Sequence, residues 1–229
     1  MLSLKSRILG EEKMMIVLSG MIGAGKSSLT NILAEHLGTQ AFYEQVDDNP
    51  VLPLFYANPK KYAFLLQIYF LNKRFASIKR ALADDNNVLD RSIYEDALFF
   101  HMNAEMGRAT EQEVQVYDEL LDNMMEELPY AAHKKAPDLL IHLVISYDKM
   151  LAHIQKRGRP YEQPQNDASL VDYYHNLLDR YQQWYQDYHY GPKMQIDCDK
   201  YDFVDNLADR QAVLRIIDKK LQERKTLDN

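Results

Sequence analysis

Short apolar runs alternate along the chain with longer segments of helical periodicity. The runs at residues 16–18 (IVL), 88–89 (VL) and 139–145 (LLIHLVI) are followed by stretches whose apolar residues recur every three or four positions. This spacing places apolar side chains on one face of a helix, whereas a short continuous apolar run is typical of a buried strand. The chain therefore reads as strands separated by helices.

The pattern places each predicted element on the sequence. Strands are expected at residues 16–18, 40–44, 88–89, 139–145 and 193–196. Helices are expected at residues 26–37, 59–83, 93–105, 110–128, 147–156, 168–188 and 206–223. Strands that alternate with helices form a mostly parallel sheet, so we predict an α/β fold in which a parallel β-sheet of about five strands is flanked by helices.

The length of 229 residues suits one domain, which we expect to span residues 14–229. Residues 1–13 are expected to be a flexible N-terminal overhang, because Met14 and Met15 directly precede the first apolar strand. The polar segment at about 156–166 contains arginine, glycine, proline and asparagine. It is predicted to form a short basic lid.

Composition and charge exclude several classes of protein. Hydrophobic residues make up 46% of the chain and charged residues 27%, which argues against disorder. The formal net charge of −7 argues against binding to nucleic-acid polymers, and no apolar run approaches the roughly 20 residues of a membrane span. Cys198 is the single cysteine, so an intramolecular disulfide is excluded and a reducing, cytoplasmic setting is expected.

A complete phosphate-loop motif follows the first strand. Residues 20–27 read GMIGAGKS, which matches G-x-x-x-x-G-K-[ST] between a strand and a helix. Backbone N–H groups of such a loop surround a phosphate; the lysine reaches the β- and γ-phosphates and the serine hydroxyl ligates Mg²⁺. The predicted phosphate-binding residues are Gly20, Met21, Ile22, Gly23, Ala24, Gly25, Lys26, Ser27 and Ser28.

Phosphate loops occur in switches, motors and kinases. The sequence has no N-K-x-D motif for reading guanine, which argues against a GTPase. It also has no long apolar strand that ends in Asp-Glu, as motor ATPases have. A small-molecule kinase is the favoured class.

Charged residues follow the predicted strands at the edge where parallel sheets bind ligands. Glu44 follows the second strand and could accept a proton from an acceptor hydroxyl. Asp90 ends the third strand and could hold Mg²⁺, while Arg91 could neutralise phosphate. A solvated glutamate and an Asp–Arg surface pair are the structural alternatives.

The predicted lid carries a basic cluster. Lys156, Arg157 and Arg159 lie within four residues, beside Gly158 and Pro160, which suit a closing loop. Arginine side chains next to a phosphate site can stabilise charge in the transition state. A solvated charged loop is the alternative.

In this order the motifs resemble those of the deoxynucleoside kinase family over about residues 14–223, and within it the bacterial deoxyadenosine/deoxyguanosine kinases. The resemblance rests on the phosphate loop together with Glu44, Tyr56, Gln67, Arg74, Asp90-Arg91-Ser92, Asp96 and the KRGR lid. It implies a P-loop kinase fold, ATP as phosphate donor, Mg²⁺, and a homodimer. The implied activity is 5′-phosphorylation of deoxynucleosides for salvage, with purines as first choice.

The resemblance also implies a role for each matching residue. Glu44 is the base toward the 5′-hydroxyl, with Asp90 on the Mg²⁺ side and Arg91 near the 5′-oxygen. Tyr56 and Glu162 bind the sugar 3′-hydroxyl, Gln67 faces the base, and Arg157 and Arg159 are the lid arginines. The remaining roles fall to Arg74 and Asp96 at the other edge of the base, Phe100 stacked on it, and Asp202 and Phe203 near the adenine of ATP.

Helical spacing supports part of this assignment. Gln67 and Arg74 are seven residues apart on one predicted helix and share a face, and Asp96 precedes Phe100 by one turn. Core packing is the alternative for Phe100, and a backbone-bonded glutamine for Gln67. Asp90 stands where many relatives have glutamate, and His153 where some have a third arginine.

Three alternative functions stay open. A pyrimidine-specific or broad-specificity deoxynucleoside kinase would keep the same motifs. A nucleoside monophosphate kinase would need basic groups for the phosphate of its acceptor, where this chain offers Glu44, Tyr56 and Glu162. A non-catalytic nucleotide sensor would bind without turnover.

Overall fold

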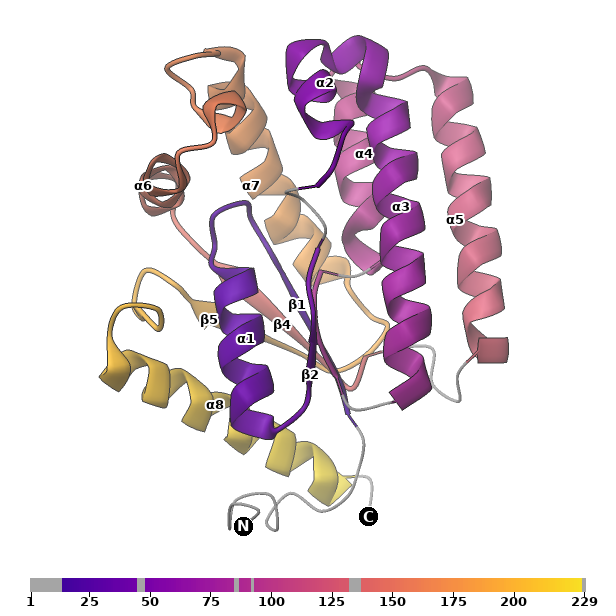
Figure 1. The fold of residues 1–229 in the computed structure, drawn as a ribbon. Helices are drawn as coiled ribbons and strands as arrows, with labels where there is room; N and C mark the ends of the chain where they lie inside the picture. The colour runs from indigo at the N-terminus through magenta and orange to yellow at the C-terminus, as the bar shows by residue number, and fades with distance from the viewer. Residues whose placement is uncertain (1–13, 45–47, 85–86, 92, 132–136, 228–229) are drawn as a thin grey trace.

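The fold is built around one parallel sheet, seen in a computed structural model that describes residues 14–44, 48–84, 87–91, 93–131 and 137–227. The five strands pair in the order β2-β3-β1-β4-β5, every pair parallel (Figure 1). The predicted α/β fold is therefore confirmed; the predicted overhang lies outside the described residues. The strands are β1 (Met15–Gly20), β2 (Gln40–Phe42), β3 (Asn87–Asp90), β4 (Leu139–Val144) and β5 (Lys193–Asp197).

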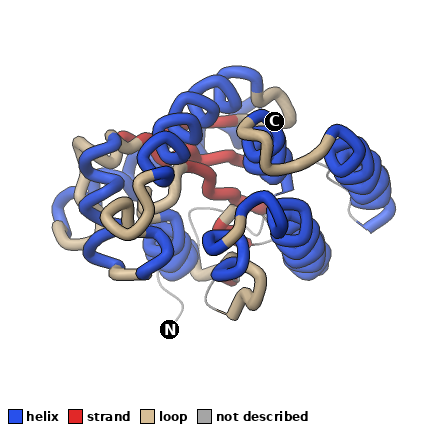
Figure 2. Tube along the Cα trace, turned by 90° about the horizontal axis from the view of Figure 1, so that it is seen from above, coloured by secondary structure: helices blue, strands red, loops and turns tan. Residues whose placement is uncertain are grey.

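Helices connect the strands and cover both faces of the sheet. They are α1 (Lys26–Leu37), α2 (Leu52–Ala57), α3 (Pro59–Asp84), α4 (Asp96–Glu105), α5 (Glu111–Ala131), α6 (Tyr147–Arg157), α7 (Ser169–Asp187) and α8 (Leu207–Leu227), with short 3₁₀ helices η1 (Ile93–Glu95) and η2 (Pro160–Glu162). Figure 2 shows the strands between helical layers. Among the described residues, none of the helices combines the length and apolar character needed to cross a bilayer.

Alternate residues of the strands enter two hydrophobic cores. Ile16 and Leu18 of β1 belong to the core shared with α1, α7 and α8. Val17, between them, belongs to the core shared with α3, α4 and α5. Side chains alternate between the faces of a strand, so an apolar run such as IVL is explained by burial on both faces.

The register aligns the ends of the central strands. Leu18 of β1 lies opposite Asp90 of β3, and Gly20 lies opposite Leu143 of β4. The segment after β1 and the charged residues after β3 therefore emerge at one edge, the carboxyl edge of the sheet, as the sequence predicted.

Helix α2 is an element that the periodicity did not predict. It has only six residues and follows Asn49, whose side-chain oxygen accepts hydrogen bonds from the backbone N–H groups of Val51 and Leu52. Phe55 of α2 packs against Leu66 of α3. Side-chain capping and this packing stabilise a helix that is too short for a periodic signal.

Candidate active site

A glycine-rich loop joins β1 to α1 at the carboxyl edge. Gly25 precedes α1 with a left-handed φ of 91°, and no described side chain caps the first turn of the helix. The backbone N–H groups of that turn are thus available to an anion. A Cβ at Gly20 would lie 2.6 Å from the carbonyl oxygen of Leu143, so only glycine fits where β1 and β4 approach.

Lys26 folds over this loop. Its Nζ donates hydrogen bonds to the carbonyl oxygens of Gly20 and Met21, each at 2.9 Å. Burial, together with the charge of Arg91, lowers the pKa of Lys26 to about 8 despite the carboxylates nearby. A buried ammonium in this state gains from an added negative charge, which a bound phosphate would provide.

An open cavity beside the loop brings together the residues predicted to bind the phosphate donor. It is lined by residues 23–28, by α6 and by residues 198–205. Phe203 lies close to the loop, because a Cβ on Gly25 would be 3.1 Å from its ring. Asp202 also lines the cavity and accepts a hydrogen bond from the backbone N–H of Asp205. Of the residues predicted to bind ATP or its phosphates, Gly20, Met21, Ile22 and Arg159 lie outside this lining.

His153 is a further contact with the phosphate loop. Its Nδ1 lies 2.7 Å from the carbonyl oxygen of Gly23, which identifies Nδ1 as the protonated nitrogen. His153 therefore attaches α6, which leads into the lid, to the loop. Sequence analysis identified this position only as a departure from the arginine of some relatives.

Ser27 and Asp90, the two residues predicted to hold Mg²⁺, lie in direct contact. The Ser27 hydroxyl donates to Asp90 Oδ2, while Asp90 Oδ1 is buried without a hydrogen-bond partner among the described residues. Burial raises the pKa of Asp90 above its ordinary value, although Lys26 opposes the shift. A hydroxyl beside an unpaired carboxylate oxygen is a donor set that fits Mg²⁺, which takes few protein oxygens and completes its shell with phosphate and water.

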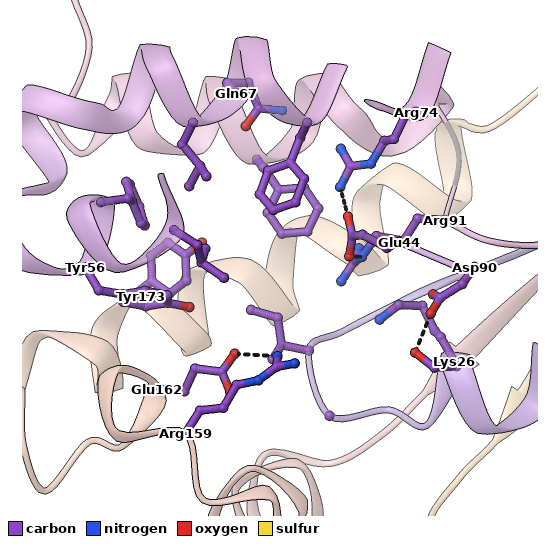
Figure 3. Close-up of a pocket in the computed structure, with 18 of the residues that line it drawn as sticks. Lys26, Glu44, Tyr56, Gln67, Arg74, Asp90, Arg91, Arg159, Glu162 and Tyr173 are labelled. Carbon is purple, nitrogen blue, oxygen red and sulfur yellow. Dashed lines mark hydrogen bonds and ion pairs between the residues drawn. The ribbon is translucent and has the colours of Figure 1, made fainter. Parts of the chain in front are cut away.

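A second cavity, drawn in Figure 3, adjoins the first. Its lining includes the predicted acceptor-site residues Glu44, Tyr56, Gln67, Arg74, Arg91 and Glu162, the predicted metal ligand Asp90, and the lid arginines Arg157 and Arg159. Two predicted residues, Asp96 and Phe100, do not line it. The cavities share Gly23, Lys26, Ser27 and Arg157, so the phosphate loop and one lid arginine form a common wall.

Glu44 is held between two arginines in this cavity. Its Oε1 accepts from Arg74 Nη2, and its Oε2 accepts from Arg91 Nε at 2.9 Å (Figure 3). Burial favours the protonated carboxyl, but the charges of Arg74, Arg91 and Lys26 outweigh it and hold the pKa of Glu44 below its ordinary value. Glu44 is therefore ionised at neutral pH, as a proton acceptor must be.

Arg91 is fixed by its backbone and by its neighbours. Among the described residues, Arg91 is the one non-glycine residue with a positive φ, 70°. This conformation costs about 1–3 kcal/mol and persists only where the surrounding structure enforces it. The Arg91 N–H donates to the carbonyl of Leu18, and its Nη1 donates to Glu95 and to the Tyr181 hydroxyl. These contacts hold the guanidinium against Glu44.

Asp96 lies behind the part of the cavity that Gln67 and Arg74 line, which is the end predicted to hold the nucleobase (the base end). It is fully buried, forms an ion pair with Arg74 and accepts a hydrogen bond of 2.6 Å from the Tyr117 hydroxyl. The Gln67 amide donates to the backbone carbonyl of Asp96 at 2.9 Å. Asp96 thus orients Arg74, and Gln67 and Arg74 line the cavity directly.

Phe100, predicted to stack on the nucleobase, does not line the cavity, and its stacking role stays a prediction. Its side chain is fully buried and packs on the ring of Tyr117, with centroids 4.8 Å apart. Phe99 lines the cavity instead, with the guanidinium of Arg91 4.8 Å from its ring centroid. Successive helix residues point about 100° apart, so only one of two adjacent phenylalanines faces the cavity, and the sequence held no signal for which.

The lid arginines meet the predicted sugar-binding carboxylate. Arg157 Nη2 donates to Glu162 Oε2 at 2.5 Å. Arg159 Nη1 lies 3.4 Å from Oε1 of the same carboxylate (Figure 3). Tyr56 stacks on Tyr161 with centroids 5.0 Å apart. Tyr56 and Glu162 thus lie along one side of the cavity.

Comparison with known proteins agrees with this geometry. The family model described as "Deoxynucleoside kinase" matches residues 16–222. The chain is 67% identical to a deoxyguanosine kinase of Lactobacillus acidophilus, covering 91% of each chain. It is 58% identical to a deoxyadenosine kinase of the same organism, covering 91% of this chain and 96% of the relative. A solved deoxyadenosine kinase from M. mycoides with bound dCTP superposes with a TM-score of 0.74 and 26% identity, covering 90% of this chain and all of that one.

Proposed function

The chain belongs to the deoxynucleoside kinase family, and we propose that it transfers the γ-phosphoryl group of ATP to the 5′-hydroxyl of a purine deoxynucleoside. One observation carries this proposal: the donor cavity and the acceptor cavity meet at Gly23, Lys26, Ser27 and Arg157. A phosphoryl group bound at this common wall would face an acceptor hydroxyl from the other side, the in-line arrangement that the reaction requires.

The donor half of the mechanism belongs to the phosphate loop. The backbone N–H groups at the start of α1 bind the phosphates, and Lys26 exchanges its carbonyl contacts for phosphate oxygens. Mg²⁺, held by Ser27 and Asp90, would neutralise charge on the phosphates. Arg157 and Arg159 stabilise the charge on the transferring group from the lid.

The acceptor half belongs to Glu44. The 5′-oxygen attacks phosphorus while its proton passes to the Glu44 carboxylate, and the bond from phosphorus to the ADP oxygen breaks. Arg91, fixed against Glu44, lies where it can stabilise the 5′-oxygen. Tyr56 and Glu162 hold the sugar.

A purine acceptor is supported by the residues at the base end. Gln67 offers both a donor and an acceptor, Arg74 offers donors, and Phe99 offers a ring face. Both Lactobacillus relatives carry names that specify purine deoxynucleosides. We infer deoxyguanosine and deoxyadenosine as the acceptors.

The enzyme is further proposed to act as a cytoplasmic homodimer. Exposed apolar side chains on two adjacent helices support self-association: Leu65 of α3 is 49% exposed and Val116 of α5 is 54% exposed. The presence of a single cysteine, the buried Cys198, suits a reducing compartment.

The test is an assay of ADP release with Mg-ATP, using each of the four deoxynucleosides and, in parallel, each of the four deoxynucleoside monophosphates. We expect turnover of deoxyguanosine or deoxyadenosine and none of the monophosphates. Turnover of only deoxycytidine or thymidine would overturn the purine assignment. Turnover of only monophosphates, or of no acceptor, would overturn the proposed reaction.

A further inference from the structure

Arg74 connects the base end of the acceptor cavity to the predicted catalytic carboxylate. The same guanidinium donates to Glu44 through Nη2 and pairs with Asp96 through Nη1. Resting on the proposed function, we propose that Arg74 is a positioning residue that withdraws from Glu44 when a purine binds. Recognition of the nucleobase would then release the Glu44 carboxylate to accept the proton of the 5′-hydroxyl. Arg74 would then control the rate of transfer in addition to acceptor binding.

An unpartnered donor shows where the base would bind. Arg74 is only 7% exposed, yet its Nε has no hydrogen-bond partner among the described residues. An unsatisfied buried N–H is costly, and Arg74 lines the cavity, so a ligand acceptor would satisfy it. In a guanidinium, Nε–H and an Nη2–H lie along one edge, the fork that matches O6 and N7 of guanine.

Occupation of this fork competes with Glu44. Arg74 Nη2 donates to Glu44 in the structure. A purine that accepts a hydrogen bond from Arg74 Nε would also attract Nη2, because both nitrogens lie on the same edge of the guanidinium. Glu44 would lose one of its two ion-pair partners and keep Arg91. An oxygen freed in this way becomes available to the 5′-hydroxyl, and the carboxylate becomes a stronger proton acceptor because one positive charge has moved away.

Arg74 is the partner that we expect to move, by turning about its ion pair with Asp96. Arg91 is held by Glu95 at 2.9 Å, by the Tyr181 hydroxyl and by its backbone bond to Leu18. The charged groups around Glu44 come from every element packed on it: Lys26 of α1, Arg74 of α3, and Asp90 and Arg91 at the end of β3, with Glu95 of η1, Asp96 of α4 and Tyr181 of α7 behind the arginines.

Selectivity would consequently appear in the rate of transfer. An acceptor whose base lacks O6 or N7, deoxyadenosine included, would bind through its sugar and Gln67 but leave Arg74 on Glu44, and it would be phosphorylated more slowly than deoxyguanosine. An interaction that helps only in the transition state changes kcat, whereas uniform binding changes KM. Loss of an O6 or N7 acceptor should therefore slow transfer even at saturating nucleoside.

The experiment measures single-turnover transfer from ATP at saturating acceptor, which isolates chemistry from product release. The acceptors are deoxyguanosine, 7-deaza-2′-deoxyguanosine, which lacks N7, and 2-aminopurine 2′-deoxyriboside, which lacks O6. We expect at least one analogue to be transferred about tenfold more slowly or worse by the unmodified protein. Equal rates for all three, with differences only in the concentration needed for saturation, would overturn the proposal.

Two variants localise the effect. Arg74→Lys keeps a cation for Asp96 but removes the fork, and should bring the rates for the three acceptors within about twofold of one another. Gln67→Ala, the matched control at the base end without contact to Glu44, should raise KM and keep the rate difference. A difference in transfer rate among the three acceptors that persists in Arg74→Lys would overturn the proposal. If that variant does not fold, the comparison of the three acceptors in the unmodified protein decides the question. Failure of the proposed function is distinct, since no deoxynucleoside would then be consumed.

Discussion

The hydroxyl of Ser27 donates a hydrogen bond to a carboxylate oxygen of Asp90, across 63 positions of the sequence. This bond joins the start of α1 to the end of β3 and leaves the other Asp90 oxygen buried without a partner among the described residues. The pair is thus a preformed oxygen site beside the phosphate loop. Its position follows from the parallel register of β1 and β3.

Asp90→Asn tests this site. The substitution keeps the shape of the side chain but removes the charge that would attract Mg²⁺. We expect the Mg²⁺ concentration for half-maximal activity to rise about tenfold or more, corresponding to roughly 1.4 kcal/mol of lost binding. Titration of activity with Mg²⁺ at fixed ATP measures it, with thermal unfolding as a check on folding. An unchanged Mg²⁺ requirement would remove Asp90 from the metal site.

Glu44→Gln tests the proton acceptor. The amide cannot take the proton of the 5′-hydroxyl, so turnover should fall about 10²-fold or more while acceptor affinity stays within a few-fold. The matched control is Glu105→Gln, which removes an exposed carboxylate paired with Arg180 outside the acceptor cavity. Normal turnover of Glu44→Gln, measured beside this control, would show that another group accepts the proton.

The pH dependence of turnover gives a second view of Glu44. Arg74, Arg91 and Lys26 hold the pKa of Glu44 below its ordinary value despite burial. The pH profile of kcat/KM, which reports the free enzyme, should fall only as pH passes through that lowered value, so this group should cause no loss of kcat/KM between pH 8 and about 5. An acid limb of kcat/KM attributable to Glu44 near neutral pH would mean that the arginines do not pair with it in the free enzyme.

His142 makes the stability of the fold sensitive to acid. Burial in β4, with the charge of Lys26, lowers the pKa of His142 to about 4, and its Nδ1 lies 3.1 Å from the Ser19 hydroxyl. Between the ordinary histidine pKa near 6.5 and this value, the unfolded chain binds a proton that the folded chain does not. Stability is therefore lost as pH falls through that window.

We expect His142 alone to lower the free energy of unfolding by about 2 kcal/mol between pH 7 and pH 5. Urea denaturation of the unmodified protein and of His142→Gln at both pH values measures this contribution. The control is His189→Gln, which alters an exposed histidine. The same loss in His142→Gln as in the unmodified protein would assign the acid sensitivity to other groups.

Periodicity and motif spacing predicted the parallel sheet and the position of the phosphate loop, because both follow from local sequence. The contact between Arg74 and Glu44 could not be predicted from the sequence, because it joins α3 to the segment after β2 and depends on how a long helix crosses the sheet. Helix α2 was missed because capping by Asn49 and tertiary packing, rather than periodicity, stabilise it. Whether Phe99 or Phe100 faces the cavity depends on the rotation of α4 about its axis, and the identity of no single residue determines that rotation.

That rotation can be tested with two neighbouring substitutions. Phe99→Ala should raise KM for the acceptor, because its ring lines the cavity, and should cost little stability since the side chain is only half-buried. Phe100→Ala should lower the free energy of unfolding by about 3–5 kcal/mol, because a fully buried ring packed on Tyr117 leaves a void. Steady-state kinetics and urea denaturation of both alanine variants measure these effects. Phe99→Leu and Phe100→Leu form a milder pair for comparison. If both leucine variants fold and Phe100→Leu has the larger effect on KM, the stacking role belongs to Phe100.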